Sequence, residues 1–268
     1  MKYYADSGNA REDEALVQKI YREFDEDSRL TKSKAAQVEF ATTVNYIERY
    51  LTPGARILDI GAGAGEYSLF FAGKGYHVSA LELADRNIAA FRAKMTGEEE
   101  IDLVQGNALD LSRWGDDSFD VVLLFGPLYH LHDPEDRRRC IREAMRVCKP
   151  EGVLFFAFIA NDIVILTMFD CQPDYFINGA YDKETFKVDD FPFVFHTVED
   201  CRALLDGCGV RILHEVAADG VSELLQEKIN AMDDRSFAQY LRFHEYICEK
   251  PECLGMSNHL LFVGRKQR

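Results

Sequence analysis

Short apolar runs alternate with stretches of helical periodicity through the middle of the chain. Runs typical of buried strands occur at 56–60, 76–83, 101–105, 119–125 and 153–159. The stretches between them in which apolar residues recur every three or four positions are 66–74, 87–95 and 134–148. Strands and helices that alternate at this spacing predict a parallel sheet with helices on both faces.

The run 121–125 is apolar without alternation, which is typical of a strand that is covered on both faces. The helix that follows it has a clear start, because Asp133 can cap it and Pro134 suits its first position. Pro150 and Gly152 end it. This part of the pattern therefore predicts a buried strand, a loop and then a surface helix.

The flanking regions complete the predicted fold. Residues 11–51 have the pattern of two helices, and the segment 161–196 is irregular and rich in aromatic residues. The remaining segments read as a helix at 198–207, a strand at 210–216, a helix at 222–248 and a strand at 260–264. The sequence thus predicts an α/β protein with a Rossmann-like, mostly parallel seven-stranded sheet, N-terminal helices and an inserted cap.

Composition narrows the class of protein. The formal net charge of −15 repels a phosphate backbone, and the arginine run 137–139 fits a solvated helix face, so nucleic acid is not expected as a partner. No apolar run is long enough to span a membrane. The polar, acidic start of the chain lacks the features of a secretion signal, and the seven cysteines form no C-x-x-C pair. We therefore expect a cytoplasmic protein with free thiols.

A glycine turn, G-x-G-x-G at 61–65, lies where the first strand should end and the first helix begin. In an open parallel sheet, ligands bind in the crevice at the carboxyl ends of the strands. Glu66 occupies the position of the third glycine in a dinucleotide fingerprint, and Asp59 is poorly suited to a pyrophosphate. Glu82 ends the second strand, where an acid can accept the hydroxyls of a ribose. These residues favour an adenosine ligand without phosphates.

The segment 57–65 resembles the first motif of class I S-adenosylmethionine-dependent methyltransferases. The resemblance continues through Glu82, the step 106–108 after the third strand, the strand at 119–122 and the turn at 147–153. The sequence Gly-Pro-Leu-Tyr-His-Leu that follows the fourth strand is similar to a bacterial subgroup that methylates small molecules. This resemblance implies S-adenosylmethionine as the cofactor and a small molecule as the methyl acceptor.

The resemblance also implies roles for individual residues. Its implied cofactor contacts are the backbone of Gly61, Ala62 and Gly63, the side chains of Asp59 and Glu82, and Leu83, Asn107, Ala108 and Phe125 around the adenine and the sulfonium. Many members of the family have Asp where this chain has Asn107, an amide that can both donate and accept.

The resemblance further implies that residues 1–52 form a helical lid from which Tyr21 and Arg29 reach the cofactor. The methyltransferase domain would then span 53–268, and its insertions at 161–196 and 220–250 would cover the substrate. For Tyr21 simple helix packing is an open alternative. For the aromatic segment at 161–196 the alternatives are a small separate core or a dimer surface, and the oligomeric state, monomer or homodimer, stays open.

We expect the methyl group to be transferred beside the loop that follows the fourth strand. His130 and His132 are candidates for a base or a substrate contact because imidazole titrates near neutrality, and Tyr129 is a candidate wall or hydrogen-bond donor. A structural or solvated histidine is the alternative. No histidine pairs with cysteine or carboxylate at a metal-ligand spacing, so no metal is expected.

Two other classes of function stay open at this point. A nicotinamide-dependent oxidoreductase could use a similar sheet, although the missing third glycine and Asp59 count against it. A non-catalytic module that binds S-adenosylmethionine is the other alternative, because the binding motifs are clearer than the catalytic residues. The sequence does not distinguish an oxygen, nitrogen or sulfur nucleophile.

Overall fold

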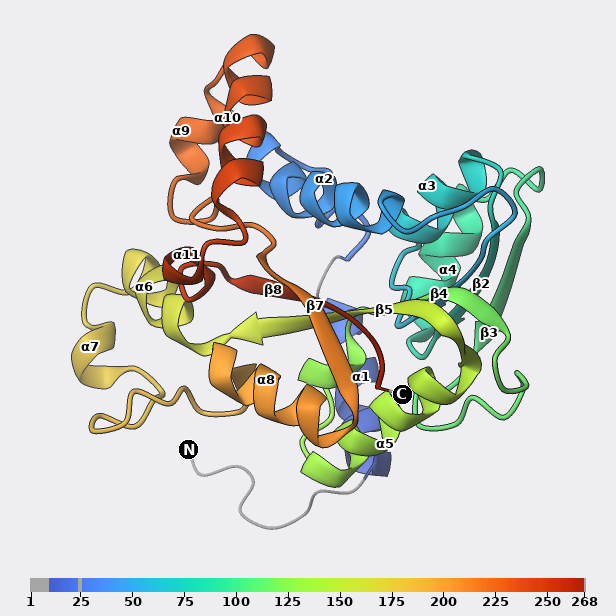
Figure 1. Cartoon of the computed structure of the whole chain (residues 1–268). Coiled ribbons are helices and arrows are strands. Elements are labelled where there is room, and N and C mark those ends of the chain that lie inside the picture. Colours follow the sequence, from blue (N-terminus) through green and yellow to red (C-terminus); the bar gives the residue numbers. More distant parts are fainter. Residues whose placement is uncertain (1–9, 24–25, 268) are drawn as a thin grey trace.

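The computed structural model describes residues 10–23 and 26–267, and Figure 1 shows their arrangement. Within these residues the strands are β1 (Arg56–Ile60), β2 (His77–Glu82), β3 (Ile101–Gln105), β4 (Phe119–Leu124), β5 (Cys148–Ala160), β6 (Phe195–His196), β7 (Val210–Ala217) and β8 (His259–Lys266). The helices are α1 (Ala10–Glu23), α2 (Lys34–Glu48), α3 (Glu66–Gly73), α4 (Asp85–Lys94), α5 (Pro134–Val147), α6 (Asn161–Cys171), α7 (Tyr175–Asn178), α8 (Val198–Gly207), α9 (Gln226–Asn230), α10 (Asp234–Ile247) and α11 (Pro251–Leu254).

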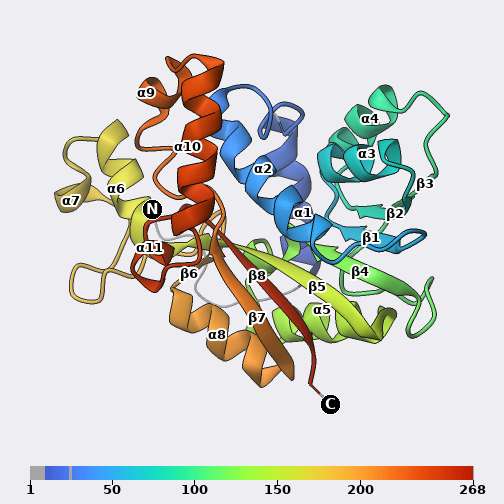
Figure 2. The same cartoon turned by 45° about the horizontal axis from the view of Figure 1, so that its top comes forward.

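The strands form one sheet in the order β3-β2-β1-β4-β5-β8-β7, and β6 pairs with β5 beside this path. All pairs are parallel except those of β8, which runs antiparallel to both β5 and β7. In both views α2 and α10 lie on one side of the sheet, and α5 and α8 lie on the other (Figures 1 and 2). The predicted Rossmann-like α/β fold is confirmed.

Two details differ from the prediction. The described sheet has eight strands instead of seven, because β6 adds a two-residue strand that the irregular sequence around it did not signal. The helix expected at 222–248 is divided into α9 and α10. The division occurs at Asp233, whose extended backbone and side chain cap a new helix by accepting a hydrogen bond from the Ser236 N–H. Asp is a common N-cap residue, so this break was visible in the sequence.

The strands are buried in the way that the apolar runs predicted. Residues 121–124 of β4 are fully enclosed, as expected for a central strand between two helix layers. At the start of α5, Asp133 accepts the Glu135 N–H and Pro134 occupies the first turn, as predicted. All seven cysteines are free. None of the helices in the described part of the chain combines the length and apolar content needed to cross a membrane.

The order of the strands determines where a ligand can bind. The chain leaves β1 on the side of β2 and β3, and later returns on its other side through β4 and β5. The connections therefore diverge between β1 and β4, which opens a crevice at the carboxyl ends of these strands. The glycine turn and the loop after β4 both lie at this edge.

Candidate functional site

The glycine turn joins β1 to α3 and is held against the end of β2. The N–H groups of Gly61 and Ala62 donate to the Leu81 carbonyl at 2.8 and 3.1 Å. Gly61 has a φ of +77°, and a Cβ there would lie 2.6 Å from the Phe125 carbonyl oxygen. Only glycine fits this point, because the backbones after β1 and β4 approach each other too closely for a side chain.

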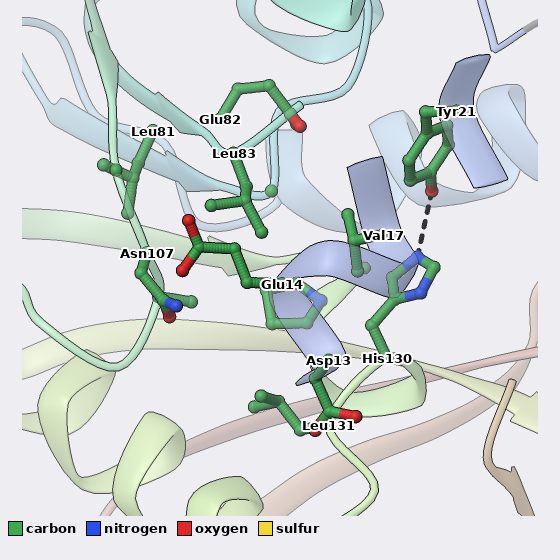
Figure 3. A pocket seen from close by; sticks show the side chains of 15 residues that line it. Asp13, Glu14, Val17, Tyr21, Leu81, Glu82, Leu83, Asn107, His130 and Leu131 are labelled. Carbon is green, nitrogen blue, oxygen red and sulfur yellow. Dashed lines mark hydrogen bonds between the residues drawn. The ribbon is translucent and has the colours of Figure 1, made fainter. Parts of the chain in front are cut away.

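A cavity opens beside this turn. Its walls come from the ends of β1 and β2, the loops after β3 and β4, and helix α1 (Figure 3). Among the predicted cofactor residues, those that line it are Tyr21, Gly61, Glu82, Leu83, Asn107 and Ala108. The fold thus brings together residues that are separated by almost ninety positions in the sequence.

Glu82 is the central acid of this cavity. Its carboxylate accepts the N–H groups of Gly63 and Ala84, each at 2.7 Å, so it fastens the glycine turn to β2. The side chain is buried, and burial raises the pKa of the Glu82 carboxyl. The Asn87 side-chain NH₂ also donates to this carboxylate, at 3.4 Å. A carboxylate has about four acceptor positions, so one of them is left for a ribose hydroxyl.

Asn107 and Leu83 form the part of the wall that the adenine would meet. The Asn107 side-chain oxygen accepts the Leu109 N–H at 2.9 Å. Its NH₂ group makes no hydrogen bond within the described residues and can donate to a ring nitrogen. Figure 3 shows the Glu14 side chain reaching from α1 toward the side of the cavity where Leu81 and Asn107 lie.

A second cavity adjoins the first at Tyr21 and Gly61. Asp59 lies in its wall, fully buried, and its Oδ2 accepts the Ser68 hydroxyl at 2.7 Å. The Asp59 Oδ1 has no hydrogen-bond partner within the described residues. Burial raises the pKa of this carboxyl to about 7. A buried acceptor without a donor fits the ammonium end of an amino-acid-bearing cofactor, because such a group costs free energy unless a donor reaches it.

The rest of this second cavity is aromatic and charged. Ala62, Gly63, Phe125, Tyr129 and Arg29 all line it. The Arg29 guanidinium bonds to Glu26 at 2.9 Å and to Glu39 at 2.6 Å. Every residue predicted to contact the cofactor therefore lies in one or both of these adjoining cavities. The contacts with a cofactor stay a prediction.

Helix α1 covers the first cavity from above. Asp13 accepts the backbone N–H of His132 at 3.0 Å and pairs with its Nδ1 at 2.7 Å. Gln18 donates to the Leu83 carbonyl at 2.8 Å, which anchors the next turn of the helix beside the adenine wall. Parts of the predicted lid, residues 1–9 and 24–25, lie outside the described residues. The described part has the position that a lid requires.

His130 is buried between α1 and the aromatic insertion. Its Nε2 shares a hydrogen bond of 3.0 Å with the Tyr21 hydroxyl, and its Nδ1 is buried without a partner among the described residues (Figure 3). Its ring lies 5.0 Å from that of Tyr129 and 5.3 Å from that of Phe193. Burial, with a smaller contribution from His132, lowers the pKa of His130 to about 3. This imidazole is therefore neutral near pH 7 and is a weak base.

The insertion at 161–196 contributes both to a small core and to the site. Ile165, Tyr175, Tyr181 and Val188 form an apolar cluster of their own. Phe193 nevertheless reaches the ring of Tyr129 at 6.1 Å. The small separate core that the sequence left open as an alternative is therefore present, and the substrate cover and the dimer surface stay predictions.

The sequence analysis missed a cluster formed by Glu39, Asp219 and His259. One ligand-type atom of each lies within 4.8 Å of the others. These residues come from α2, the loop after β7 and the first position of β8, and their separation along the chain hides them from any search for local spacing. Only the antiparallel β7–β8 pair makes Asp219 and His259 neighbours.

Comparisons with known proteins agree with the fold. A family model described as a methyltransferase domain matches residues 58–156. The chain is similar to YqeM of Bacillus subtilis, a methyltransferase by name, with 29% identity over 205 residues that cover 65% of this chain and 80% of that protein. It is 33% identical over 115 residues to a ubiquinone biosynthesis O-methyltransferase of Hahella chejuensis, which covers 42% of this chain and less than half, 46%, of that protein.

The fold comparison includes a structure that holds a demethylated cofactor product. It is 1,6-didemethyltoxoflavin-N1-methyltransferase of Burkholderia thailandensis with bound S-adenosylhomocysteine, at a TM-score of 0.61 and 17% identity. The match covers 99% of this chain and 94% of that one, so it shows that the whole chain shares the fold.

Proposed function

We propose that this chain is an S-adenosylmethionine-dependent methyltransferase that transfers the methyl group to an oxygen, nitrogen or sulfur atom of a small planar molecule. The observation that carries this proposal is the pair of adjoining cavities, one with Glu82 and the other with Asp59. The first provides ribose and adenine contacts. The second provides an unpaired acceptor for an ammonium group.

The residues that would hold S-adenosylmethionine fit its two ends. Glu82 and Asn107 suit the ribose and the adenine, and Asp59 suits the amino group. When bound, the cofactor supplies a methyl carbon that is already electrophilic. The protein's own contribution is alignment of the acceptor and exclusion of water, and orientation alone can contribute roughly 7–11 kcal/mol to lowering the barrier.

The acceptor space adjoins Phe125 and Tyr129 in the second cavity. Aromatic walls favour a flat apolar ring, and the O-methyltransferase relative is named for the synthesis of ubiquinone. The net charge of −15 supports a small-molecule acceptor instead of a nucleic acid. In this proposal the segments 161–196 and 220–250 cover the acceptor and residues 1–52 cover the cofactor.

Two finer assignments belong to the same proposal. We assign the chain to a bacterial subgroup of small-molecule methyltransferases, an assignment supported by the sequence at 126–131, of which Gly126, Pro127, His130 and Leu131 line the first cavity. We place the reaction in the cytoplasm, where seven cysteines without a disulfide are usual.

Calorimetric titration of the purified chain with S-adenosylmethionine and with NAD tests the cofactor. Heat of binding is expected with S-adenosylmethionine alone, since the turn lacks a phosphate site. Incubation with a panel of phenols, amines and thiols is then expected to produce S-adenosylhomocysteine with at least one class. Binding of NAD alone, or tight binding of S-adenosylmethionine without any product, would refute the proposal.

His130→Gln is expected to change cofactor binding more than turnover. A histidine whose pKa is lowered to about 3 stays neutral from pH 5 to pH 9 and takes up protons poorly. Its structural contribution is the hydrogen bond to Tyr21 on the lid. We expect the Kd for S-adenosylmethionine to rise about threefold to tenfold, the range of one neutral hydrogen bond, while kcat falls by less. A loss of kcat by about 10² or more with an unchanged Kd would restore His130 as the base.

A further inference from the structure

Glu14 is a carboxylate of α1 that lines the first cavity and has no part in the function proposed above. The residues of α1 that line this cavity are Asp13, Glu14, Val17 and Tyr21, which share one face of the helix. Asp13 bonds to His132, and Tyr21 bonds to His130. Glu14, in contrast, makes no hydrogen bond or ion pair to any residue that the structure describes. All its acceptor positions are therefore open to a ligand.

Two anchors of α1 fix the place of Glu14 over the cavity. Immediately before it, Asp13 bonds to the backbone N–H and the ring of His132 in the loop after β4. One turn after it, Gln18 donates to the Leu83 carbonyl at 2.8 Å. Gln18 is four residues from Glu14, on the same face and about 6 Å along the helix axis. The backbone of Glu14 is therefore held between the loop after β4 and the end of β2.

The carboxylate of Glu14 points into the part of the cavity assigned to the adenine. Figure 3 shows it extended from α1 toward Leu81 and Asn107, which belong to the end of β2 and the loop after β3. An acid on the lid and an amide on the sheet thus face the same space from opposite sides. Three carboxylates and neither lysine nor arginine stand among the described residues of this lining, which suits a ligand group that donates hydrogen bonds.

The two side chains have complementary hydrogen-bonding groups. The Asn107 oxygen accepts the Leu109 N–H at 2.9 Å, while its NH₂ group has no partner within the described residues and can donate to a ring nitrogen. The exocyclic amine of adenine is itself a donor, so it needs an acceptor. Three N–H groups already occupy the Glu82 carboxylate. Glu14 is the side chain of this cavity whose acceptor positions are unused.

We propose that the Glu14 carboxylate accepts a hydrogen bond from the exocyclic amine of the adenine, so that the lid recognises the base of the cofactor. This inference rests on the proposed function. Asn107 donates to a ring nitrogen while Glu14 accepts from the amine, and the two together select a 6-aminopurine. Because Glu14 lies on α1, the same hydrogen bond fastens the lid to the bound cofactor.

Calorimetric titration with two ligands tests the contact without turnover. The probes are S-adenosylhomocysteine and its 6-deamino analogue, in which a hydrogen atom replaces the amine and the ring nitrogens are unchanged. The intact wild-type protein should bind S-adenosylhomocysteine about tenfold more tightly, because a site built to bond an N–H group rejects a ligand that lacks it. Glu14→Ala should reduce this ratio of Kd values to about threefold or less. Glu14→Gln, which keeps an oxygen acceptor without the charge, should give an intermediate ratio.

Two control variants separate contact with the base from a general effect on the lid. Glu12→Ala removes an exposed acid of the same helix that is not among the residues lining the cavity, and it should leave both Kd values unchanged. Asp13→Asn weakens the anchor at His132 and should raise both Kd values by the same factor. The ratio between the two ligands should therefore stay at its wild-type value in both controls.

Hydrogen exchange of α1 provides a second measurement. In the wild-type protein S-adenosylhomocysteine should slow the exchange of residues 10–23 more than the 6-deamino analogue does at equal saturation, because the hydrogen bond to the amine fastens the helix. In Glu14→Ala the two ligands should protect the helix equally. Equal protection by both ligands in the wild-type protein would contradict the proposed fastening of the lid.

The outcomes distinguish this inference from the proposed function. If neither S-adenosylmethionine nor S-adenosylhomocysteine binds, both are refuted. If S-adenosylhomocysteine binds and Glu14→Ala keeps the wild-type ratio, Glu14 is a solvated position of the helix and only its role is lost. A ratio near one in the wild-type protein would likewise overturn the role of Glu14 and leave the methyltransferase.

Discussion

Glu82→Ala is expected to weaken the binding of S-adenosylmethionine by roughly 10- to 150-fold. This range corresponds to about 1.5–3 kcal/mol, the contribution of a hydrogen bond to a charged group. The loss has two sources. A ribose hydroxyl loses its acceptor, and the N–H groups of Gly63 and Ala84 lose the carboxylate that fastens the glycine turn to β2.

Isothermal titration with S-adenosylhomocysteine measures this effect without turnover. Glu82→Gln is a finer probe, because its amide oxygen can accept one of the two N–H groups while its NH₂ group cannot accept the other. Asp102→Ala is the control, since that carboxylate lies on the neighbouring strand β3 in an exposed ion pair with Arg113. Wild-type affinity in Glu82→Ala would remove the ribose assignment.

Gly65→Ala is expected to destabilise the fold by about 2–5 kcal/mol. Gly65 precedes α3 with a φ of +87°, a conformation that costs an L-residue about 1–2 kcal/mol. A Cβ at this position would lie 2.4 Å from the ring of Phe91, which is fully buried and cannot move aside freely. Overpacking of this kind costs a further 1–3 kcal/mol, approximately.

Thermal unfolding checks this prediction. A loss of about 2–5 kcal/mol should lower the Tm by roughly 4–20 °C for a domain of this size. Gly73→Ala is the matched control at the other end of the same helix, where a Cβ would meet no atom within 4 Å. That variant should gain about 0.5–1 kcal/mol, because alanine loses less conformational entropy in a helix. Equal Tm values for the two variants would refute the steric argument.

The periodicity of apolar residues identified most elements of the fold because it follows directly from burial. β4 is enclosed on both faces and reads as a continuous apolar run, and the capping residues Asp133 and Pro134 lie at the start of α5. Where burial leaves no such pattern, the prediction was weaker. The two-residue strand β6 depends on local backbone geometry, whereas the break between α9 and α10 was missed although Asp233 is a common N-cap residue.

The cofactor side of the site could also be predicted from the sequence. The glycine turn follows β1, Glu82 ends β2 and Asn107 lies two residues after β3, and parallel strands bring their carboxyl ends to one edge. Residues at the carboxyl ends of neighbouring strands therefore lie close together at this edge, although they are far apart in the sequence. The sequence alone did not indicate that Gly63 and Glu82 bond to each other, because a hydrogen bond across two strands has no signature in spacing.

The surroundings of the histidines depended on tertiary structure. His130 lies in the loop after β4, and its position in the sequence does not show that its side chain is buried. Burial lowers its pKa to about 3, which makes it a weak base. Asp219 and His259 are forty residues apart, and Glu39 comes from the other end of the chain. The sequence by itself thus determined the strands, the helices and the adenosine-binding edge, since these arise from local pattern and strand order. Only the folded chain decided the ionisation of the histidines, because ionisation depends on charges and burial contributed by distant segments.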